Sequence, residues 1–385
     1  MGQVRVVEAS VHRFRFELDK PFRIAIGFTK VKEEIVVRLV DNAGNIGWGE
    51  ASPSPIILGS TPDTVLAALD VLIPTILGED PRRLHYLVDR MDRVLLDHAP
   101  AKAALDMALH DLVGQVTGEP VWRLLGGSRA EPVDTDFTVG IDTPEIMAAE
   151  AEALVAAGFR TIKVKVGEAP RLDLDRVRRI RDAVGDNVAL RIDANQGWTR
   201  AEAVWALVRM ADYAIQFVEQ PVAAEDIEGL AWVRQRSPIP VMADEAVHSV
   251  ADALRVVQAE AADYVNIKLM KAGGLRRAVE IATICAAAGV PNMIGGMVES
   301  NLSATAAVHF ALAEGNVVFR DLDIGERPET QLVAEGGSYI EAGQQLLADR
   351  DSPGFGFRRI REEWLVPVKT YRFGEGGERE GSIAA

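Results

Sequence analysis

The pattern of hydrophobic and polar residues changes near residue 134 of this chain. Before that point, residues 4–16 alternate apolar and charged positions and residues 33–40 hold a β-branched run, as half-buried antiparallel strands do. Residues 64–77 and 101–116 repeat apolar residues with helical spacing. The pattern in the first third of the chain therefore predicts a layer of strands and helices.

After residue 134, short apolar segments alternate with amphipathic helical patterns such as residues 144–157, 173–184, 200–210 and 275–288. Strands that are apolar on both faces indicate a parallel sheet covered by helices. A closed (β/α) barrel fits the repeats better than a doubly wound sheet, because no glycine-rich dinucleotide turn follows the first strand. The predicted strands are residues 137–140, 161–166, 189–193, 215–219, 241–244, 264–268, 292–295 and 317–321.

These patterns place the chain in the α/β class and divide it at Gly126-Gly127. We expect an α+β domain over residues 1–125 and a barrel over residues 126–349. The tail, about residues 350–385, is expected to return to the first domain and complete it.

Composition narrows the possible functions. The chain has 57 acidic and 42 basic residues, a formal net charge of −15, which argues against a nucleic-acid or anionic-membrane surface. Its single cysteine, Cys285, excludes an intramolecular disulfide and a cysteine-rich zinc site. No apolar run reaches the ~18 residues of a membrane span, and the N-terminal pattern is that of a strand rather than a signal peptide. We therefore expect a cytoplasmic protein.

Charged residues recur where the predicted barrel strands end, which is where active sites of such barrels lie. The third, fourth and fifth strands end in Asp193, Glu219 and Asp244, and the sixth ends in Lys268. Successive members of this series are 26, 25 and 24 residues apart, about one βα unit each. A charge that recurs at the same place in consecutive units must converge on one rim.

Three carboxylates without a nearby His or Cys suit a hard divalent cation such as Mg²⁺. The six histidines show no i, i+4 pair, which disfavours a histidine-based zinc site. A single acidic residue at a strand end is often only a helix cap or a surface ion pair. Three such residues in register make that explanation much weaker.

Lys163 and Lys165 lie two apart on the second predicted strand and so point to one face. They either face solvent at an edge or point into the barrel, and the apolar neighbours Ile162, Val164 and Val166 favour a covered strand with inward lysines. Crowding of two ammonium groups and desolvation would both lower a lysine pKa and make the amine a better base.

Five short motifs in this order make the chain resemble the muconate-lactonising subgroup of the enolase superfamily. The resemblance covers nearly the whole chain, including residues 47–50 and 103–111 of the first domain. The motifs are Lys163-Val164-Lys165, Asp193-Ala194-Asn195, Glu219-Gln220-Pro221, Ala243-Asp244-Glu245 and Asn266-Ile267-Lys268.

The resemblance implies a modified TIM-type barrel under an N-terminal α+β capping domain. It also implies one Mg²⁺ per subunit, held by Asp193, Glu219 and Asp244, and a homo-oligomer. Lys165 and Lys268 would face each other across the substrate α-carbon. Removal of a proton next to a carboxylate gives an enediolate, which a metal ion stabilises. Lysines on both faces suit inversion of a stereocentre, but also cycloisomerisation or dehydration.

Residues at the end of the eighth strand narrow the range of possible substrates. Asp321-Leu322-Asp323 resembles the pair with which dipeptide epimerases bind a free α-ammonium, with Lys163 tuning Lys165 and contacting the substrate carboxylate. We expect epimerisation of the C-terminal residue of an L,L-dipeptide. Three alternatives remain: an N-acylamino acid racemase, a muconate-type cycloisomerase, and a non-catalytic binding or scaffold barrel. The alternative for Asp321 and Asp323 is that they are exposed on a loop and bind no substrate.

Side-chain specificity is expected from residues 26–30 and 53–59, with residues 296–299 and Thr138 on the first strand. Relatives that act on L-Ala-L-Glu place an arginine where this chain has Gly27. Phe28, Ile56 and Ile57 instead predict a neutral or hydrophobic pocket. Glu299 would favour a cationic side chain, unless it only supports its neighbours.

Overall fold

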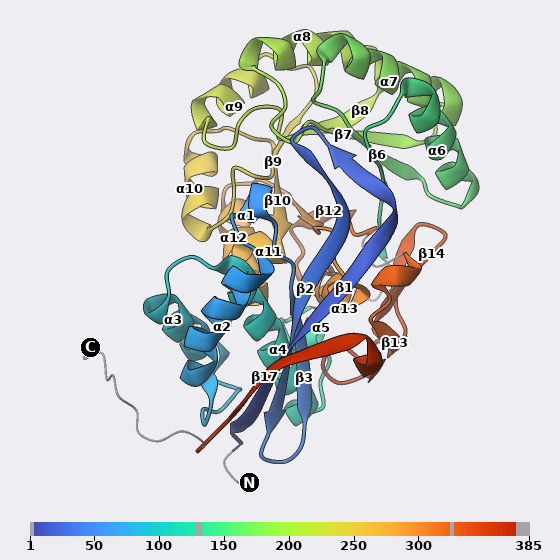
Figure 1. Cartoon of the computed structure of the whole chain (residues 1–385). Coiled ribbons are helices and arrows are strands. Elements are labelled where there is room, and N and C mark those ends of the chain that lie inside the picture. Colours follow the sequence, from blue (N-terminus) through green and yellow to red (C-terminus); the bar gives the residue numbers. More distant parts are fainter. Residues whose placement is uncertain (1–3, 128–132, 324–326, 375–385) are drawn as a thin grey trace.

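The first layer of the protein is an antiparallel sheet packed against helices (Figure 1). The computed structural model describes residues 4–127, 133–323 and 327–374. The strand order is β17-β1-β2-β3, with β1 Val6–Ile24, β2 Gly27–Asp41, β3 Ile46–Ala51 and β17 Leu365–Arg372. The tail thus pairs antiparallel with the first strand of the chain.

 The paired segment of β1 runs from Glu8 to Phe14, and its partners lie between Leu365 and Arg372.

Three helices cover one face of this sheet: α2 Pro62–Ile76, α3 Leu84–Val94 and α4 Ala99–Thr117. Thr61 caps α2 in a reciprocal pair with Thr64, as its position before Pro62 predicts. Helix α4 lies very close to β3, because a Cβ built on Gly49 would stand 2.0 Å from the Ala104 carbonyl oxygen. Glycine is therefore needed where the predicted strand and helix meet.

The second layer is a nearly closed barrel of eight parallel strands in the order β12-β11-β10-β9-β8-β7-β6-β5. This confirms the predicted (β/α) barrel under an N-terminal cap. Five strands have the predicted bounds, while β5, β6 and β9 end one residue earlier, where their ladders stop. The strands are β5 Phe137–Val139, β6 Thr161–Lys165, β7 Ala189–Asp193, β8 Ile215–Glu219, β9 Val241–Ala243, β10 Tyr264–Lys268, β11 Asn292–Gly295 and β12 Val317–Asp321.

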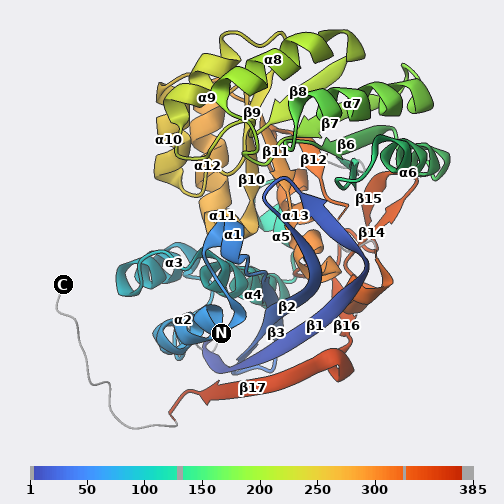
Figure 2. The ribbon, with the colours of Figure 1, turned by 45° about the horizontal axis from the view of Figure 1, so that its top comes forward.

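Helices surround these strands, as Figure 2 shows for α6 to α10. Ile162 and Val164 of β6 belong to the apolar core with residues of these helices, so Lys163 and Lys165 point to the barrel interior. Helix α13 is buried around most of its circumference. The helices are α6 Pro144–Ala156, α7 Pro170–Val184, α8 Arg200–Met210, α9 Ile227–Arg234, α10 Val250–Gln258, α11 Leu269–Ala272, α12 Leu275–Ala287 and α13 Asn301–Ala313.

Several short elements were not predicted from the sequence. They make two small sheets after the barrel, and β15 also pairs with β4, which precedes the barrel. Their strands are too short for a period of two to be recognised. They are β4 Val133–Asp134, β13 Val333–Gly336, β14 Ser338–Glu341, β15 Gln344–Leu347 and β16 Phe357–Ile360, with short helices α1 Pro55–Leu58 and α5 Val121–Leu124.

The hairpin of β1 and β2 reaches over the carboxyl ends of the barrel strands (Figures 1 and 2). At its tip, the carbonyl oxygen of Arg23 accepts a hydrogen bond of 3.0 Å from the Ile141 N–H. A Cβ on Gly197 would stand 2.8 Å from the Ala25 side chain, so the tip lies against a barrel loop. The cap thereby roofs the rim where the charged residues meet.

Two further observations concern the predictions made from composition and domain boundaries. Among the helices in the described ranges, none has the length and apolar character needed to cross a membrane. The boundaries near residues 125 and 349 stay a prediction, which limited proteolysis can test.

Candidate active site

The three predicted metal ligands lie together at the rim. Asp193 ends β7, Glu219 ends β8, and Asp244 follows β9. One carboxylate oxygen of each lies within 4.8 Å of the other two, and the side chains are buried. Within the described part of the chain, no other set of acidic, histidine or cysteine residues has this geometry. The oxygen-only donor set fits a hard divalent cation.

Neighbouring polar groups hold these carboxylates in place. The Asn195 N–H donates to Asp193 Oδ1 at 2.9 Å, and Asn266 Nδ2 donates to Glu219 Oε1 at 2.7 Å. Lys271, which the sequence did not single out, donates to Asp244 Oδ1 and to its carbonyl oxygen. Such outer contacts fix the orientation of metal ligands.

The catalytic lysines predicted on β6 and β10 each contact a member of this triad. Lys165 Nζ lies 2.6 Å from Asp193 Oδ2, and Lys268 Nζ lies 2.7 Å from Asp244 Oδ2. Both side chains are buried, and both line the same pocket. The structure therefore brings together two amines from strands that are more than a hundred residues apart in the chain (165 and 268).

Lys163 is not among the described residues that line the pocket. Its Nζ is 2.6 Å from Asp321 Oδ2, 2.7 Å from Glu219 Oε2 and 3.2 Å from Asp193 Oδ2. Lys163 thus joins the triad to the eighth strand.

The expected lowering of the pKa is wrong for Lys163, which lies among carboxylates. Burial by itself lowers the pKa of Lys163, but Asp321, Glu219 and Asp193 together raise it well above the ordinary value. Burial likewise opposes the charge of Lys268, yet Asp244 and Glu219 raise its pKa. Carboxylates that surround an ammonium outweigh the repulsion between neighbouring ammonium groups.

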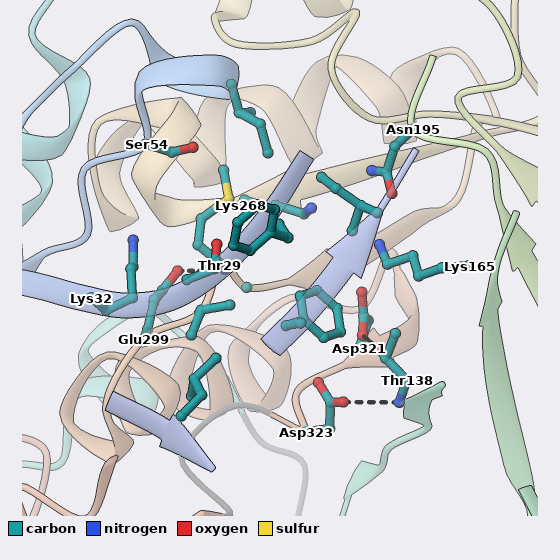
Figure 3. A pocket seen from close by; sticks show the side chains of 18 of the residues that line it. Thr29, Lys32, Ser54, Thr138, Lys165, Asn195, Lys268, Glu299, Asp321 and Asp323 are labelled. Carbon is teal, nitrogen blue, oxygen red and sulfur yellow. Dashed lines mark hydrogen bonds between the residues drawn. The ribbon is translucent and has the colours of Figure 1, made fainter. Parts of the chain in front are cut away.

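The acidic pair of the eighth strand lines the pocket beside Thr138 (Figure 3). Asp323 Oδ2 accepts a hydrogen bond of 2.9 Å from the Thr138 N–H, and Thr138 Oγ1 lies 3.5 Å from Asp321 Oδ1. Burial opposes the ionised form of both aspartates. Lys163 nevertheless holds the pKa of Asp321 below its ordinary value, whereas Asp321 helps burial to raise the pKa of Asp323. The pKa values of the two carboxyl groups are therefore shifted in opposite directions, although both groups line the same pocket.

The cap contributes the predicted apolar wall of the pocket. Phe28 of β2 and Ile57 of α1 both line it, and Phe28 is 64% exposed. There is little space for a side chain at position 27, because a Cβ built on Gly27 would stand 3.1 Å from the Ile56 Cδ1 atom. Glu299 lines the pocket as well, with its carboxylate accepting from the Met297 N–H and the Ser303 hydroxyl.

Sequence reasoning missed several other lining residues, among them Asn195, Lys32 and Arg327. Asn195 belongs to the quoted Asp193-Ala194-Asn195 motif, and its positive φ of 38° marks a tight turn at the rim. Lys32 had no such signal, because a lysine on an alternating strand usually faces solvent.

A capped (β/α) barrel with acidic strand ends and two lysines in one pocket defines the architectural class of this protein. The chain belongs to the mandelate racemase/muconate lactonizing enzyme family within the enolase superfamily. Residues 6–126 match that family's N-terminal domain, and residues 146–363 match the enolase C-terminal domain-like model. The resemblance found in the motifs is thereby confirmed.

Named relatives narrow the class further. An L-Ala-D/L-Glu epimerase from Bacillus subtilis is 39% identical over 340 residues, covering 87% of this chain and 93% of its own length. A hydrophobic dipeptide epimerase from Enterococcus faecalis is 38% identical over 354 residues, covering 92% and 99%. The predicted enzyme class, an isomerase of the racemase and epimerase type, is confirmed.

A solved structure shows the same architecture. The dipeptide epimerase from Cytophaga hutchinsonii, complexed with Mg and the dipeptide D-Ala-L-Val, superposes with a TM-score of 0.90 at 34% identity. The match covers 96% of this chain and all of that one. The two epimerases are named for different dipeptides, and the solved structure holds a third one, so likeness alone does not select the side chains that this protein accepts.

Proposed function

We propose that this protein is a Mg²⁺-dependent dipeptide epimerase that inverts the α-carbon of the C-terminal residue of an L,L-dipeptide. The observation that carries the proposal is the pocket itself. The amines of Lys165 and Lys268 line it beside a triad of carboxylates, and the Asp321 and Asp323 pair lines it too.

Asp193, Glu219 and Asp244 would hold one Mg²⁺ per subunit. When bound, the ion supplies positive charge to the substrate carboxylate, which makes the neighbouring α-proton more acidic. The buried, oxygen-only triad supports this role, as does the Mg in the Cytophaga hutchinsonii relative.

The two pocket lysines move the proton. One of them, as the neutral amine, takes the α-proton, and the other, as the ammonium, gives a proton to the opposite face of the carbon. The carbon leaves with inverted configuration, and each lysine ends with the proton count that the other had. Lys163 shares Asp193 Oδ2 with Lys165, so we expect it to tune Lys165, and its contact with the substrate carboxylate stays a prediction.

Asp321 and Asp323 are proposed to bind the free α-ammonium of the dipeptide. A cation beside Asp323 offsets the burial that otherwise raises the pKa of this carboxyl group. An N-acylated substrate has no such charge, which separates this proposal from an N-acylamino acid racemase. The apolar wall of Phe28, Ile56 and Ile57 supports a neutral or hydrophobic side chain in the substrate.

Deuterium exchange tests the proposal. The protein is incubated with Mg²⁺ in D₂O with L,L-dipeptides or with N-acyl amino acids, and the mass of each is followed. Gain of one deuteron in dipeptides alone is expected. Exchange confined to N-acyl amino acids would instead identify a racemase, and no exchange would favour a cycloisomerase or a scaffold barrel.

The variant Lys268→Ala tests the proposed proton transfer directly. It is expected to abolish epimerisation while circular dichroism remains that of the wild type. Full turnover by the folded variant would remove Lys268 from the mechanism. Homo-oligomerisation, expected from the family, remains a prediction that sedimentation velocity can test.

A further inference from the structure

One end of the pocket is charged and lies away from the aspartate pair. Lys32 of β2 and Glu299 after β11 both line it, and they are only 9% and 3% exposed. In Figure 3, Lys32, Glu299 and Ser54 lie toward the left of the view, whereas Thr138 and Asp323 lie below Lys268 and to the right of them. A cation and an anion therefore share a largely dehydrated wall of the pocket.

Lys32 is held in place but keeps donor capacity. Its Nζ donates to the Pro53 carbonyl oxygen at 2.8 Å and lies 3.5 Å from Glu34 Oε1. An ammonium group has three N–H donors, and these two contacts use two of them. One donor is left for a molecule in the pocket.

Glu299 is held in the same way from the barrel side. The Met297 N–H donates to its Oε1 at 2.7 Å, and the Ser303 hydroxyl donates to Oε2. A carboxylate offers about four acceptor positions, so acceptor capacity remains on Glu299. The wall thus presents a donor from the cap and an acceptor from the barrel.

We propose that this wall selects a neutral, polar side chain that both accepts and donates hydrogen bonds, with a carboxamide such as that of glutamine as the matching group. The inference rests on the proposed function and specifies its substrate. The proposed function places the substrate α-carbon between Lys165 and Lys268 and the substrate ammonium at Asp323. The C-terminal side chain of the dipeptide then extends toward Lys32.

Charge excludes the competing side chains. A cationic side chain meets the Lys32 ammonium, and an anionic one meets Glu299, with the buried Glu34 behind Lys32. An apolar side chain displaces water from both charged groups and gives them no partner. A site built to hydrogen-bond its substrate discriminates strongly against analogues that leave its buried polar groups unpaired.

Kinetics with four dipeptides test the proposal: L-Ala-L-Gln, L-Ala-L-Glu, L-Ala-L-Lys and L-Ala-L-Leu. We expect kcat/KM for L-Ala-L-Gln to exceed each of the others by about tenfold or more. Lys32→Met is expected to remove most of the advantage of L-Ala-L-Gln over L-Ala-L-Leu. Lys30→Met is the matched control, because Lys30 lies on the same strand, bonds to the Leu18 and Asp19 carbonyl oxygens and does not line the pocket.

Lys32→Met leaves Glu34 without its counter-charge, so the double variant Lys32→Met/Glu34→Met serves if the single variant does not fold. Equal kcat/KM for the glutamine and leucine dipeptides in the wild type, or an unchanged ratio in the folded variants, overturns the inference. If the wild type epimerises no dipeptide, the proposed function fails instead. Calorimetric binding of L-Ala-L-Gln and L-Ala-L-Leu then decides the inference separately, by whether the glutamine dipeptide binds more tightly.

Discussion

Replacing Asp323 with asparagine examines how the pocket recognises a free amino terminus. Asp323 Oδ2 accepts the Thr138 N–H at 2.9 Å, and the side chain lines the pocket. In Asp323→Asn, the amide oxygen takes over that hydrogen bond, so the NH₂ group occupies the other position. A donor then faces the substrate ammonium in place of a carboxylate oxygen.

The structure sets the size of the expected effect. Asp321 remains in the pocket, but its Oδ2 already lies 2.6 Å from Lys163 Nζ. In the proposed site, Asp323 is therefore the main partner of the substrate ammonium. Hydrogen bonds between charged groups contribute about 1.5–3 kcal/mol, which corresponds to a roughly 10- to 100-fold rise in KM. The value of kcat is expected to change little, because Asp323 does not contact the α-carbon in the proposed mechanism.

Steady-state epimerisation of one L,L-dipeptide, followed by polarimetry, gives KM and kcat for both proteins. The N-acetylated form of the same dipeptide is the matched control, since it lacks the ammonium. Asp323→Asn is expected to reduce the preference for the free dipeptide over the acetylated one. An unchanged KM for the free dipeptide, or equal losses for both substrates, would refute the proposed ammonium site.

Two further predictions concern other buried charges. Lys271→Met is expected to weaken Mg²⁺ binding about 10- to 100-fold by calorimetry, because Lys271 orients Asp244, and unchanged affinity would contradict that role. Burial raises the pKa of Asp111 to about 7, against the N–H donors of Phe355 and Trp48 that lower it. Asp111 therefore binds its proton more tightly in the folded protein, and stability is lost as pH rises from its ordinary value of 3.8 to about 7. Over this pH interval, the melting temperature of Asp111→Asn should fall less than that of the wild type. If the difference in melting temperature between the two proteins is the same at every pH, the prediction is contradicted.

The fold was largely predictable because the barrel is built from a local unit that repeats. Each apolar strand followed by an amphipathic helix carries its own pattern, and most strand bounds agree to the residue. The four short strands after the barrel, β13 to β16, carry no such pattern and were missed. Their pairing depends on neighbours that only the folded chain supplies.

The rim charges were predictable for a related reason. Because parallel strands end on one side of the sheet, Asp193, Glu219 and Asp244 had to converge once the barrel was recognised. The raised pKa of Lys163 was not predictable in this way. It depends on distances such as the 2.7 Å between Lys163 and Glu219, which spacing along the chain does not contain.

The sequence by itself determined the repeating barrel, its cap and the family. The barrel and the cap follow from hydrophobic periodicity, and the family follows from short motifs of neighbouring residues. Tertiary structure alone decided that Lys32 and Glu299 share one wall of the pocket. These residues lie on different domains and in unrelated local patterns. Only the docking of the cap hairpin on the barrel brings their charges together, and that docking depends on packing between distant segments.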